Sequence, residues 1–444
     1  MKLFSTKNPN KLFTLKEAVM KGLPDDNGLF VPQHIPNLPA SFFKELTDLS
    51  FPELSFQITN NLFQGAIPED DLKTIIYNAI NFSAPLIQLD KHTHVLELFH
   101  GPSLAFKDFG ARFMAGLMGY FNREEDSELV ILVATSGDTG GAVAAGFHNT
   151  PGIKVIILYP SGRVSHLQEK QLTTLGGNVS ALEINGSFDD CQALVKKAFL
   201  DQELNKQIRL SSANSINIAR LIPQSFYYFE AYKQLKDKSK APVFIIPSGN
   251  FGNLTAGLLA NRMGLPVKHF IAATNKNDVV PSYLDSGRYE PKASIPTLSN
   301  AMDVGNPSNF YRMISLFSED SNVTSLDGST WNNMKKSVSG FGFDDKTTKA
   351  AMKGGFRKYD NYIFEPHGAV GLLAWNEYQK QNPSDIGIIL ETAHPSKFIK
   401  DVEETLNIEV SIPERLACLS NKEKVSRLMD ANFDLFKEYL MNNY

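Results

Sequence analysis

The sequence has few of the residues that mark a disulfide-stabilised, metal-dependent or membrane protein. Only two of its 444 residues are cysteines, Cys191 and Cys418, and they lie far apart without metal-ligand spacing. Neither a disulfide framework nor a cysteine-rich zinc site is therefore predicted. No apolar stretch approaches the roughly 20 residues that span a membrane, and the start of the chain has no apolar run long enough for a signal peptide. We therefore expect a soluble, cytoplasmic protein with no membrane partner.

An excess of charge of either sign is also missing. The chain carries 44 Lys and Arg against 48 Asp and Glu, a formal net charge of −4, which argues against a nucleic-acid partner held by bulk charge. Its content of 42% hydrophobic and 21% charged residues is ordinary for a globular protein. A chain of 444 residues is long for a single core, so we expect two or three domains that act on a small molecule.

The two ends of the chain are predicted to be helical. Residues 1–84 are expected to form a helical cap, because Thr14-Leu-Lys-Glu17 is a capping-box pattern that opens a helix to about Lys21. A turn and a short extended piece follow at residues 22–32, and a further helix is expected around residues 70–82. Residues 401–444 are predicted to form a polar helical tail.

From about residue 85 the pattern alternates between strands and helices, which is typical of an α/β fold with a mostly parallel sheet. Strands are expected at residues 94–99, 129–135, 153–159, 179–184, 208–213, 243–246, 267–273 and 386–390. Helices are expected at residues 104–121, 165–175, 188–200, 216–235 and 254–262, with one more beginning at 141. Residues 277–345 are rich in Pro, Ser, Asn and Gly and are expected to form an irregular insertion.

Lys107 occupies an unusual position near the start of the helix expected after Leu104. Positive charge is disfavoured there by the helix dipole, and the flanking Phe106 and Phe109 imply partial burial, which favours a neutral amine. Schiff-base chemistry needs such an amine. On this stretch alone, a surface lysine that extends past an apolar helix edge is the more ordinary interpretation. The rest of the chain favours the functional one.

Two glycine-rich turns each follow a buried strand and precede a helix, where ligands gather in parallel sheets. The first, Ala134-Thr-Ser-Gly-Asp-Thr-Gly-Gly141, offers three hydroxyls and backbone N–H groups that suit a carboxylate or phosphate. The second, Pro247-Ser-Gly-Asn-Phe-Gly-Asn253, can cradle a phosphate. Each turn alone is equally well explained by geometry without a ligand. Neither matches the Walker or dinucleotide pattern, so a nucleotide cofactor is disfavoured.

Three further segments are weaker candidates. Asn214 and Arg220 lie near one expected helix start and could bind a second anion, although an ordinary helix cap explains the asparagine. Glu391-Thr-Ala-His-Pro-Ser-Lys397 follows a strand directly. His367 and His394 are more simply structural histidines, and because no third ligand lies at zinc spacing, no metal site is predicted.

Taken together, the motifs resemble those of threonine synthases, and in particular the branch with an N-terminal extension. The resemblance covers residues 1 to about 415 and rests on five motifs in the correct order: Phe99-His-Gly-Pro-Ser-Leu-Ala-Phe-Lys-Asp108, Thr135-Ser-Gly-Asp-Thr-Gly140, Pro247-Ser-Gly-Asn-Phe-Gly252, Pro307-Ser-Asn309 and Thr392-Ala-His-Pro-Ser-Lys-Phe398. Any one motif alone would be unspecific, whereas all five in order are highly specific.

The resemblance implies a fold and a domain plan. The family has the tryptophan-synthase-β type of fold, known as fold type II, with two open, twisted, mostly parallel sheets flanked by helices and a small helical N-terminal domain. The implied domains are a cap (1–84), a large cofactor-binding domain (85–106 and 223–400), a small α/β domain (107–222) and a helical tail (401–444). The oligomeric state is not specified by the sequence, and a monomer is the simplest expectation.

The resemblance also implies a cofactor, pyridoxal 5'-phosphate (PLP), and residues that contact it. Lys107 is expected to form the Schiff base with the cofactor, and Thr392 to hydrogen-bond its ring nitrogen. The residues expected at the cofactor phosphate are Ser248, Gly249, Asn250, Phe251 and Gly252, with Asn253 continuing the loop. The residues expected to bind substrate are Thr135, Ser136, Asp138 and Thr139, with Asn214 and Arg220 at its phosphate.

The activity that the resemblance implies is that of a carbon–oxygen lyase acting on phosphates. It converts O-phospho-L-homoserine and water into L-threonine and phosphate, the last step of threonine biosynthesis. One alternative is another fold type II lyase, such as a serine/threonine dehydratase, which would share Lys107 but need no second phosphate site at Arg220. A second alternative is a non-enzymatic small-molecule binding homologue that has kept the fold.

Overall fold

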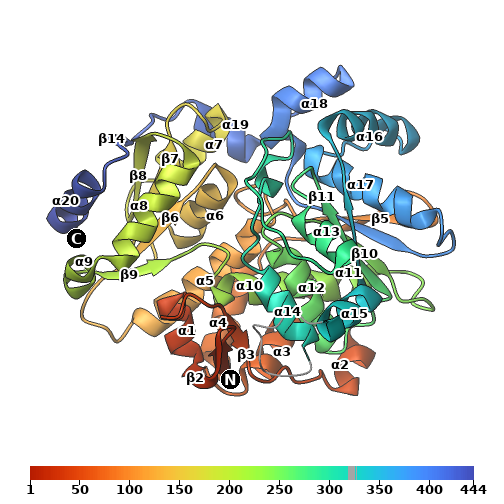
Figure 1. The fold of residues 1–444 in the computed structure, drawn as a ribbon, viewed down its shortest axis with the longest axis horizontal. Coiled ribbons are helices and arrows are strands. Elements are labelled where there is room, and N and C mark those ends of the chain that lie inside the picture. The colour runs from red at the N-terminus through yellow and green to blue at the C-terminus, as the bar shows by residue number, and fades with distance from the viewer. Residues whose placement is uncertain (319–325, 327) are drawn as a thin grey trace.

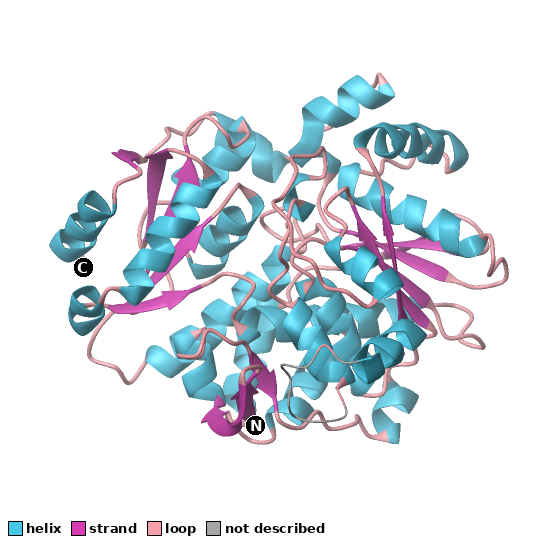
Figure 2. Cartoon of the chain, in the orientation of Figure 1, coloured by secondary structure: helices cyan, strands magenta, loops and turns pink. Residues whose placement is uncertain are grey.

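The computed structural model describes residues 1–318, 326 and 328–444. Its strands form one small sheet near the N-terminus and two larger sheets on opposite sides of the molecule, with helices around both (Figures 1 and 2). The sequence-based expectation of two open, mostly parallel sheets flanked by helices is confirmed. None of the helices in the described ranges is long and apolar enough to cross a lipid bilayer.

The larger sheet has six strands in the order β12-β11-β10-β13-β5-β4 and is parallel except for the β4–β5 pair. Its strands are β4 (Leu86–Gln88), β5 (Thr93–Glu97), β10 (Val243–Pro247), β11 (His269–Thr274), β12 (Val338–Gly342) and β13 (Gly387–Glu391). The central strands β10 and β13 are buried along their whole length, because helices cover both faces of a parallel sheet.

The second sheet has five parallel strands in the order β14-β8-β7-β6-β9. Its strands are β6 (Leu129–Ala134), β7 (Ile153–Pro160), β8 (Val179–Asn185), β9 (Arg209–Ser212) and β14 (Arg427–Asp430). The apolar run Leu129–Ala134 is fully buried, as its composition predicts. The turn after β6 and the turn after β10 both lie at the carboxyl ends of parallel strands, which is where this class of fold binds ligands.

The N-terminal region is less purely helical than predicted. It contains the three-stranded antiparallel sheet β2-β1-β3, made of β1 (Lys2–Ser5), β2 (Asn8–Thr14) and β3 (Phe30–Pro32), beside the helices α1 (Leu15–Lys21), α2 (Ala40–Glu45), α3 (Phe51–Phe63) and α4 (Glu69–Ala79). The predicted capping box is present, since the Glu17 N–H donates to the Thr14 hydroxyl at 3.2 Å. The strands are short, and their apolar residues are too few to show a period.

The C-terminal tail also differs from its prediction. It contains α18 (Ile399–Leu406), α19 (Glu414–Ser420) and α20 (Phe433–Asn443), but also β14, which pairs with β8 and extends the second sheet. Strand β14 has four residues, of which only Met429 is buried. An exposed edge strand of this kind carries almost no hydrophobic signal.

Two further predictions were wrong in detail. The long helix expected at residues 216–235 is divided into α10 (Ile218–Leu221), the 3₁₀ turn η1 (Ile222–Ser225) and α11 (Phe226–Gln234), because Pro223 cannot continue a regular helix. The insertion at residues 277–345 is more regular than expected, with α13 (Val279–Ser286), η2 (Asn300–Met302), α14 (Phe310–Phe317), α15 (Gly328–Ser337) and β12. Residues 319–325 and 327 of that insertion lie outside the described residues.

The remaining helices surround the two sheets. They are α5 (Lys107–Asn122), α6 (Asp138–Phe147), α7 (His166–Thr173), α8 (Phe188–Leu200), α9 (Gln202–Gln207), α12 (Gly252–Arg262), α16 (Asp345–Lys358), α17 (Pro366–Gln379) and η3 (Pro395–Phe398). Helix α5 packs against α1, α4, α6 and α10, so it connects the N-terminal region with the second sheet. Lys107, its first residue, therefore lies where several parts of the chain meet.

Candidate functional site

Lys107 and Thr392 are brought together by backbone hydrogen bonds between the segments that carry them. The N–H of Phe106, the residue before the lysine, donates to the Thr392 carbonyl oxygen at 2.8 Å. The His394 N–H donates to the Leu104 carbonyl oxygen at 3.0 Å in the same short antiparallel contact. The first residue of α5 therefore lies beside the carboxyl end of β13. The sequence indicated each of the two motifs by itself, but not that they are in contact.

The surroundings of Lys107 favour a neutral amine. Burial lowers the pKa of Lys107 below its ordinary value, the nearby Asp138 acts in the opposite direction, and the positive charges of Lys397 and Arg220 lower the pKa further. A neutral amine is both a nucleophile toward an aldehyde and a general base. Burial therefore acts on Lys107 in the direction that the sequence predicted, toward a neutral amine.

The loop from Gly249 to Asn253 has the features of an anion-binding cradle. Among the described residues, no protein acceptor receives the backbone N–H groups of residues 249–252, which lead into the N-terminus of α12. The Asn253 Oδ1 accepts hydrogen bonds from Tyr227 and Tyr228, which leaves its buried Nδ2 donor without a partner. A buried orphan donor beside free N–H groups at a helix start fits a phosphate.

The shape of this loop is set by contacts from two other segments, one at Ser215 and one at residues 308–309. The Asn250 side chain donates to the Ser215 hydroxyl at 2.6 Å and accepts from the Ser308 N–H at 2.6 Å. Asn309 Nδ2 donates to the Asn250 carbonyl oxygen at 3.0 Å. Phe251 has a positive φ of 59°, in the left-handed region that side chains other than glycine seldom adopt. The cradle is therefore held in shape by the protein itself.

Ser248 makes a different contribution from the rest of this loop. Its N–H donates to the Ala273 carbonyl oxygen, and its hydroxyl donates to the Ile246 carbonyl oxygen at 2.8 Å. Both of its hydrogen-bond donors are therefore engaged by the sheet. In this arrangement the serine anchors the beginning of the loop, while the donors available to a phosphate come from residues 249–253.

The first glycine-rich turn is organised by Thr135. Its hydroxyl oxygen accepts hydrogen bonds from the N–H groups of Gly137 and Gly140, both at 2.9 Å. The turn therefore folds around this buried side chain. Ser136 is exposed and Thr139 is partly buried, so both hydroxyls are open to a ligand. Thr135 therefore shapes the turn from within, and its two neighbours offer the accessible hydroxyls.

Asp138, the fourth predicted residue of this turn, lies at the start of α6 in a buried ionic contact. Its Oδ1 lies 2.8 Å from the Lys397 ammonium and accepts a hydrogen bond from Gln168 at 2.9 Å. Burial alone would raise the pKa of Asp138, but the positive charge of Lys397, the charge of Lys107 when it is protonated, and the hydrogen bonds from Lys397 and Gln168 outweigh that effect and hold the pKa well below its usual range. Asp138 is therefore an ionised carboxylate.

Arg220 of α10 packs against α5 close to Lys107. A methyl group added at Gly110, one helical turn after the lysine, would meet Arg220 Nε at 2.8 Å. The guanidinium donates to the Ala213 carbonyl oxygen at 2.7 Å, while its Nε is buried without a partner. No carboxylate of the described residues forms an ion pair with it, and burial lowers the pKa of Arg220 to about 10. This side chain is a cation that lacks an anion.

Asn214 is less firmly tied to the site. Its backbone N–H donates to the Ser212 hydroxyl at 3.3 Å, and its carbonyl oxygen accepts from Asn217. The side chain is partly buried. It follows β9 at the carboxyl end of the second sheet, close along the chain to Arg220.

Several residues around the site were missed as individual candidates. Lys397 belongs to a motif noted in the sequence, but its contact with Asp138 crosses between the sheets and leaves no local signal. Gln168 and Gln171 of α7 also make long-range contacts, with Asp138 and Lys397, that leave no local signal in the sequence. His394 binds Ser396 and His367 binds Glu365, which fits their interpretation as structural histidines. Within the described residues, no group of three potential ligands could hold a metal ion.

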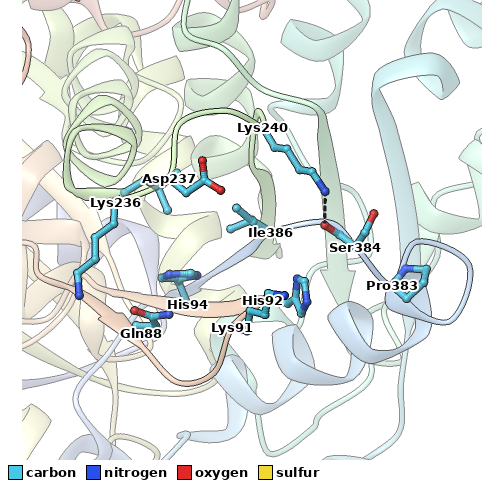
Figure 3. Close-up of a pocket in the computed structure, with 11 residues that line it drawn as sticks. Gln88, Lys91, His92, His94, Lys236, Asp237, Lys240, Pro383, Ser384 and Ile386 are labelled. Carbon is cyan, nitrogen blue, oxygen red and sulfur yellow. Dashed lines mark hydrogen bonds between the residues drawn. The ribbon is translucent and has the colours of Figure 1, made fainter.

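A separate cavity of about 650 Å³ contains none of these residues. Figure 3 shows its lining, which includes His92, His94 and Lys236 near the amino end of β5. Lys240 donates to the Ser384 carbonyl oxygen at its rim. Because the candidate residues gather at the carboxyl ends of the strands, this cavity lies away from them along the sheet.

Comparisons with known proteins agree with the geometry. The family model "Pyridoxal-phosphate dependent enzyme" matches residues 83–390. The family models "Threonine synthase N terminus" and "Threonine synthase, C-terminal" match residues 2–80 and 368–440. Together they cover nearly the whole chain.

Relatives and solved structures agree over the full length. Threonine synthase of Haemophilus influenzae is 45% identical, with 100% of both chains covered. The crystal structure of threonine synthase from Escherichia coli, at 43% identity, covers 100% of both chains with a TM-score of 0.90. The structure of PLP-bound threonine synthase from Brucella melitensis, at 34% identity, covers 100% of this chain and 99% of that one with a TM-score of 0.94. The chain therefore belongs to the threonine synthase family of pyridoxal-phosphate-dependent enzymes, with the type II fold.

Proposed function

We propose that this chain uses PLP to convert O-phospho-L-homoserine and water into L-threonine and phosphate. The observation that carries the proposal is the presence of two separate places for an anion around Lys107. One is the loop of residues 249–253 with its orphan donors, and the other is Arg220, a buried cation that has no carboxylate partner in the described part of the chain. A PLP enzyme that acts on a phosphorylated substrate needs two phosphate sites, whereas a dehydratase needs one.

Three parts of the chain would hold the cofactor. The Lys107 amine would hold its aldehyde carbon, the loop from Gly249 to Asn253 its phosphate, and the Thr392 hydroxyl its ring nitrogen. When bound, the cofactor supplies an electron sink that stabilises negative charge on the substrate carbons. A neutral hydroxyl at Thr392, in place of a carboxylate, would leave the ring nitrogen less firmly protonated.

Lys107 would then move protons. Its lowered pKa makes the free amine neutral over a wider pH range, so it can accept the proton from the substrate Cα. The same side chain, once protonated, can return a proton to a neighbouring carbon. Lys107 begins α5, and the residue before it is hydrogen-bonded to Thr392. Its amine would therefore remain next to the substrate during the reaction.

Arg220 and the turn after β6 would bind the two anionic groups of the substrate, its phosphate and its carboxylate. The guanidinium keeps an Nε donor without a protein partner, and a guanidinium can bind phosphate oxygens with a geometry that a lysine cannot match. The open hydroxyls of Ser136 and Thr139 lie in the turn that starts α6 and can bind the substrate carboxylate. A positive charge held at the leaving phosphate stabilises the charge that develops as it departs.

The proposal is tested by incubating the purified protein, loaded with PLP, with O-phospho-L-homoserine. Phosphate and threonine are measured together, and L-serine and L-threonine are offered in parallel as dehydratase substrates. Equimolar phosphate and threonine are expected. A 2-oxo acid from serine or threonine at a comparable rate would instead favour the dehydratase, and cofactor binding without any product would contradict the substrate assignment. Three predictions lie outside this test: the domain boundaries, a monomeric state and a cytoplasmic location.

A further inference from the structure

Lys397 is a second buried lysine at the site. Its ammonium lies 2.8 Å from Asp138 Oδ1, donates to the Ser103 carbonyl oxygen at 2.9 Å and donates to Gln171 Oε1 at 3.2 Å. Its side chain is 1% exposed, and that of Asp138 is 8% exposed. A lysine that is buried so completely is stable only with a full set of acceptors.

The three acceptors come from three different parts of the site. Ser103 lies in the turn that leads into Lys107, Asp138 begins α6, and Gln171 belongs to α7. Lys397 itself belongs to η3, just after β13 of the larger sheet. One ammonium group therefore connects the turn before Lys107, the glycine-rich turn of residues 134–141 and the end of the larger sheet.

Hydrogen bonds among the acceptors close this arrangement. Gln171 Nε2 donates to the Ser103 carbonyl oxygen at 3.2 Å, and Gln168 Nε2 donates to Asp138 Oδ1 at 2.9 Å. The Ser103 N–H donates to Asp108 Oδ2 at 2.8 Å. The network thus reaches from Asp138 to the first turn of α5, which carries Lys107.

We propose that Lys397 is a positioning residue for Lys107: it fixes the turn at Ser103 against the glycine-rich turn of residues 134–141, and its charge compensates that of Asp138 beside the Lys107 amine. The inference deepens the proposed function and rests on it. An ordinary structural ion pair would hold the same segments together but would leave the titration of Lys107 unchanged.

The sign of the electrostatic effect follows from the groups that face Lys107. These are Asp138 of α6, Lys397 of η3 and Arg220 of α10, with Asp108 next to it on α5. Removing the Lys397 charge would leave the Asp138 carboxylate uncompensated, which raises the pKa of the Lys107 amine. Removing the Asp138 charge would have the opposite effect. Removing both should nearly restore the original titration.

The test measures how fast the full-length chain, stripped of cofactor, captures added PLP at different pH values. The neutral Lys107 amine adds to the aldehyde carbon, a carbon–nitrogen double bond forms and one water leaves, so the rate followed by absorbance reports the neutral fraction of the amine. For Lys397→Met, we expect the midpoint of the rate profile to rise by about one pH unit, which is about tenfold slower capture below the midpoint. For Asp138→Asn, it should fall.

Three further variants separate charge from structure. Lys397→Arg keeps the charge and should keep the midpoint near that of the wild type. The double variant Lys397→Met/Asp138→Asn should also return close to it. Lys400→Met removes a nearby exposed lysine and should change nothing. Folding of each variant is checked by circular dichroism, and if Lys397→Met does not fold, Asp138→Asn and the double variant still give opposite expectations.

An unchanged midpoint in folded Lys397→Met or in Asp138→Asn would overturn the inference and leave a structural ion pair only. The same shift should appear in the acid limb of kcat for the loaded enzyme, because kcat reports the groups that titrate in the enzyme–substrate complex, where the Lys107 amine would be free. The two proposals fail differently. A shifted capture midpoint without threonine formation would contradict the proposed function alone, whereas threonine formation with an unshifted midpoint would contradict the role of Lys397 alone.

Discussion

Phe106 donates its backbone N–H to the carbonyl oxygen of Thr392 at 2.8 Å. This hydrogen bond joins the residue before Lys107 to the residue after β13, so the amine and the threonine hydroxyl belong to one rigid unit. The lysine does not depend on a flexible loop for its position. A substitution that moves either segment is therefore expected to affect the other.

The loop of residues 249–253 should not tolerate a methyl group at its first glycine. A Cβ at Gly249 would meet the Ala301 carbonyl oxygen and the Met302 Cα, both at 2.7 Å, so the backbone must shift. For Gly249→Ala we expect PLP affinity to fall at least about tenfold, measured by equilibrium absorbance titration. Gly354→Ala, where nothing lies within 4 Å, is the control and should bind PLP normally. Normal affinity in Gly249→Ala would move the phosphate site elsewhere.

Arg220 should matter for the phosphate of the substrate. For Arg220→Ala we expect KM for O-phospho-L-homoserine to rise by about tenfold to a hundredfold, because a charge-assisted contact contributes about 1.5–3 kcal/mol. PLP affinity should change much less. The matched control is Arg163→Ala, since Arg163 is exposed. Unchanged kinetics in Arg220→Ala would show that another group binds the phosphate.

Arg312 should stabilise the fold around the cofactor loop. It donates to the carbonyl oxygens of Phe30 and Ile216 at 3.0 and 2.6 Å, and to Asn309 Oδ1 at 2.8 Å. Arg312→Met leaves three acceptors without a donor and should lower the free energy of unfolding by about 2–4 kcal/mol, measured by urea denaturation. The exposed Arg288 gives the control, and Arg288→Met should stay within about 0.5 kcal/mol of the wild type.

Asp108 should make stability depend on pH in a mildly acidic window. Burial raises the pKa of this carboxyl to about 6 from an ordinary value of 3.8, so the folded chain holds its proton more tightly than the unfolded chain. Wild-type stability should therefore fall as pH rises from 4 to 6, relative to Asp108→Asn, which cannot ionise.

Above this window the difference between the two proteins should level off at roughly 2–3 kcal/mol. Unfolding of both without cofactor, at several pH values, measures it. Asp189→Asn removes an exposed carboxyl and serves as the control. A difference that does not vary with pH would show that Asp108 ionises normally in the folded chain.

The sequence predicted the parts of the fold that carry a local pattern. The buried strand β6 is a continuous apolar run, β7 is apolar apart from Lys154, and Thr14 and Glu17 form the capping box that their spacing predicts. The break at Pro223 could also have been predicted, since proline ends a regular helix. Strand β14 could not, because a short exposed strand has no hydrophobic period.

The residues of the candidate site also fall into those that a local sequence pattern indicates and those that it does not. Lys107, Thr392 and the glycine-rich turns stand out because each follows a strand or begins a helix, where ligands bind. The contact of Lys397 with Asp138 joins residues far apart in the sequence, and no periodicity or spacing indicates it. The same is true of the orphan donors of Arg220 and Asn253, since an orphan is defined by all its neighbours at once.

The most direct test of the account is to find which lysine carries the cofactor. The PLP-loaded protein is reduced with borohydride, digested and analysed by mass spectrometry, so that the modified side chain is read from the labelled peptide. We expect the label on Lys107 and none in Lys107→Ala, which should also form no threonine. A label on Lys397, the other buried lysine of the site, or on any third lysine would contradict the account.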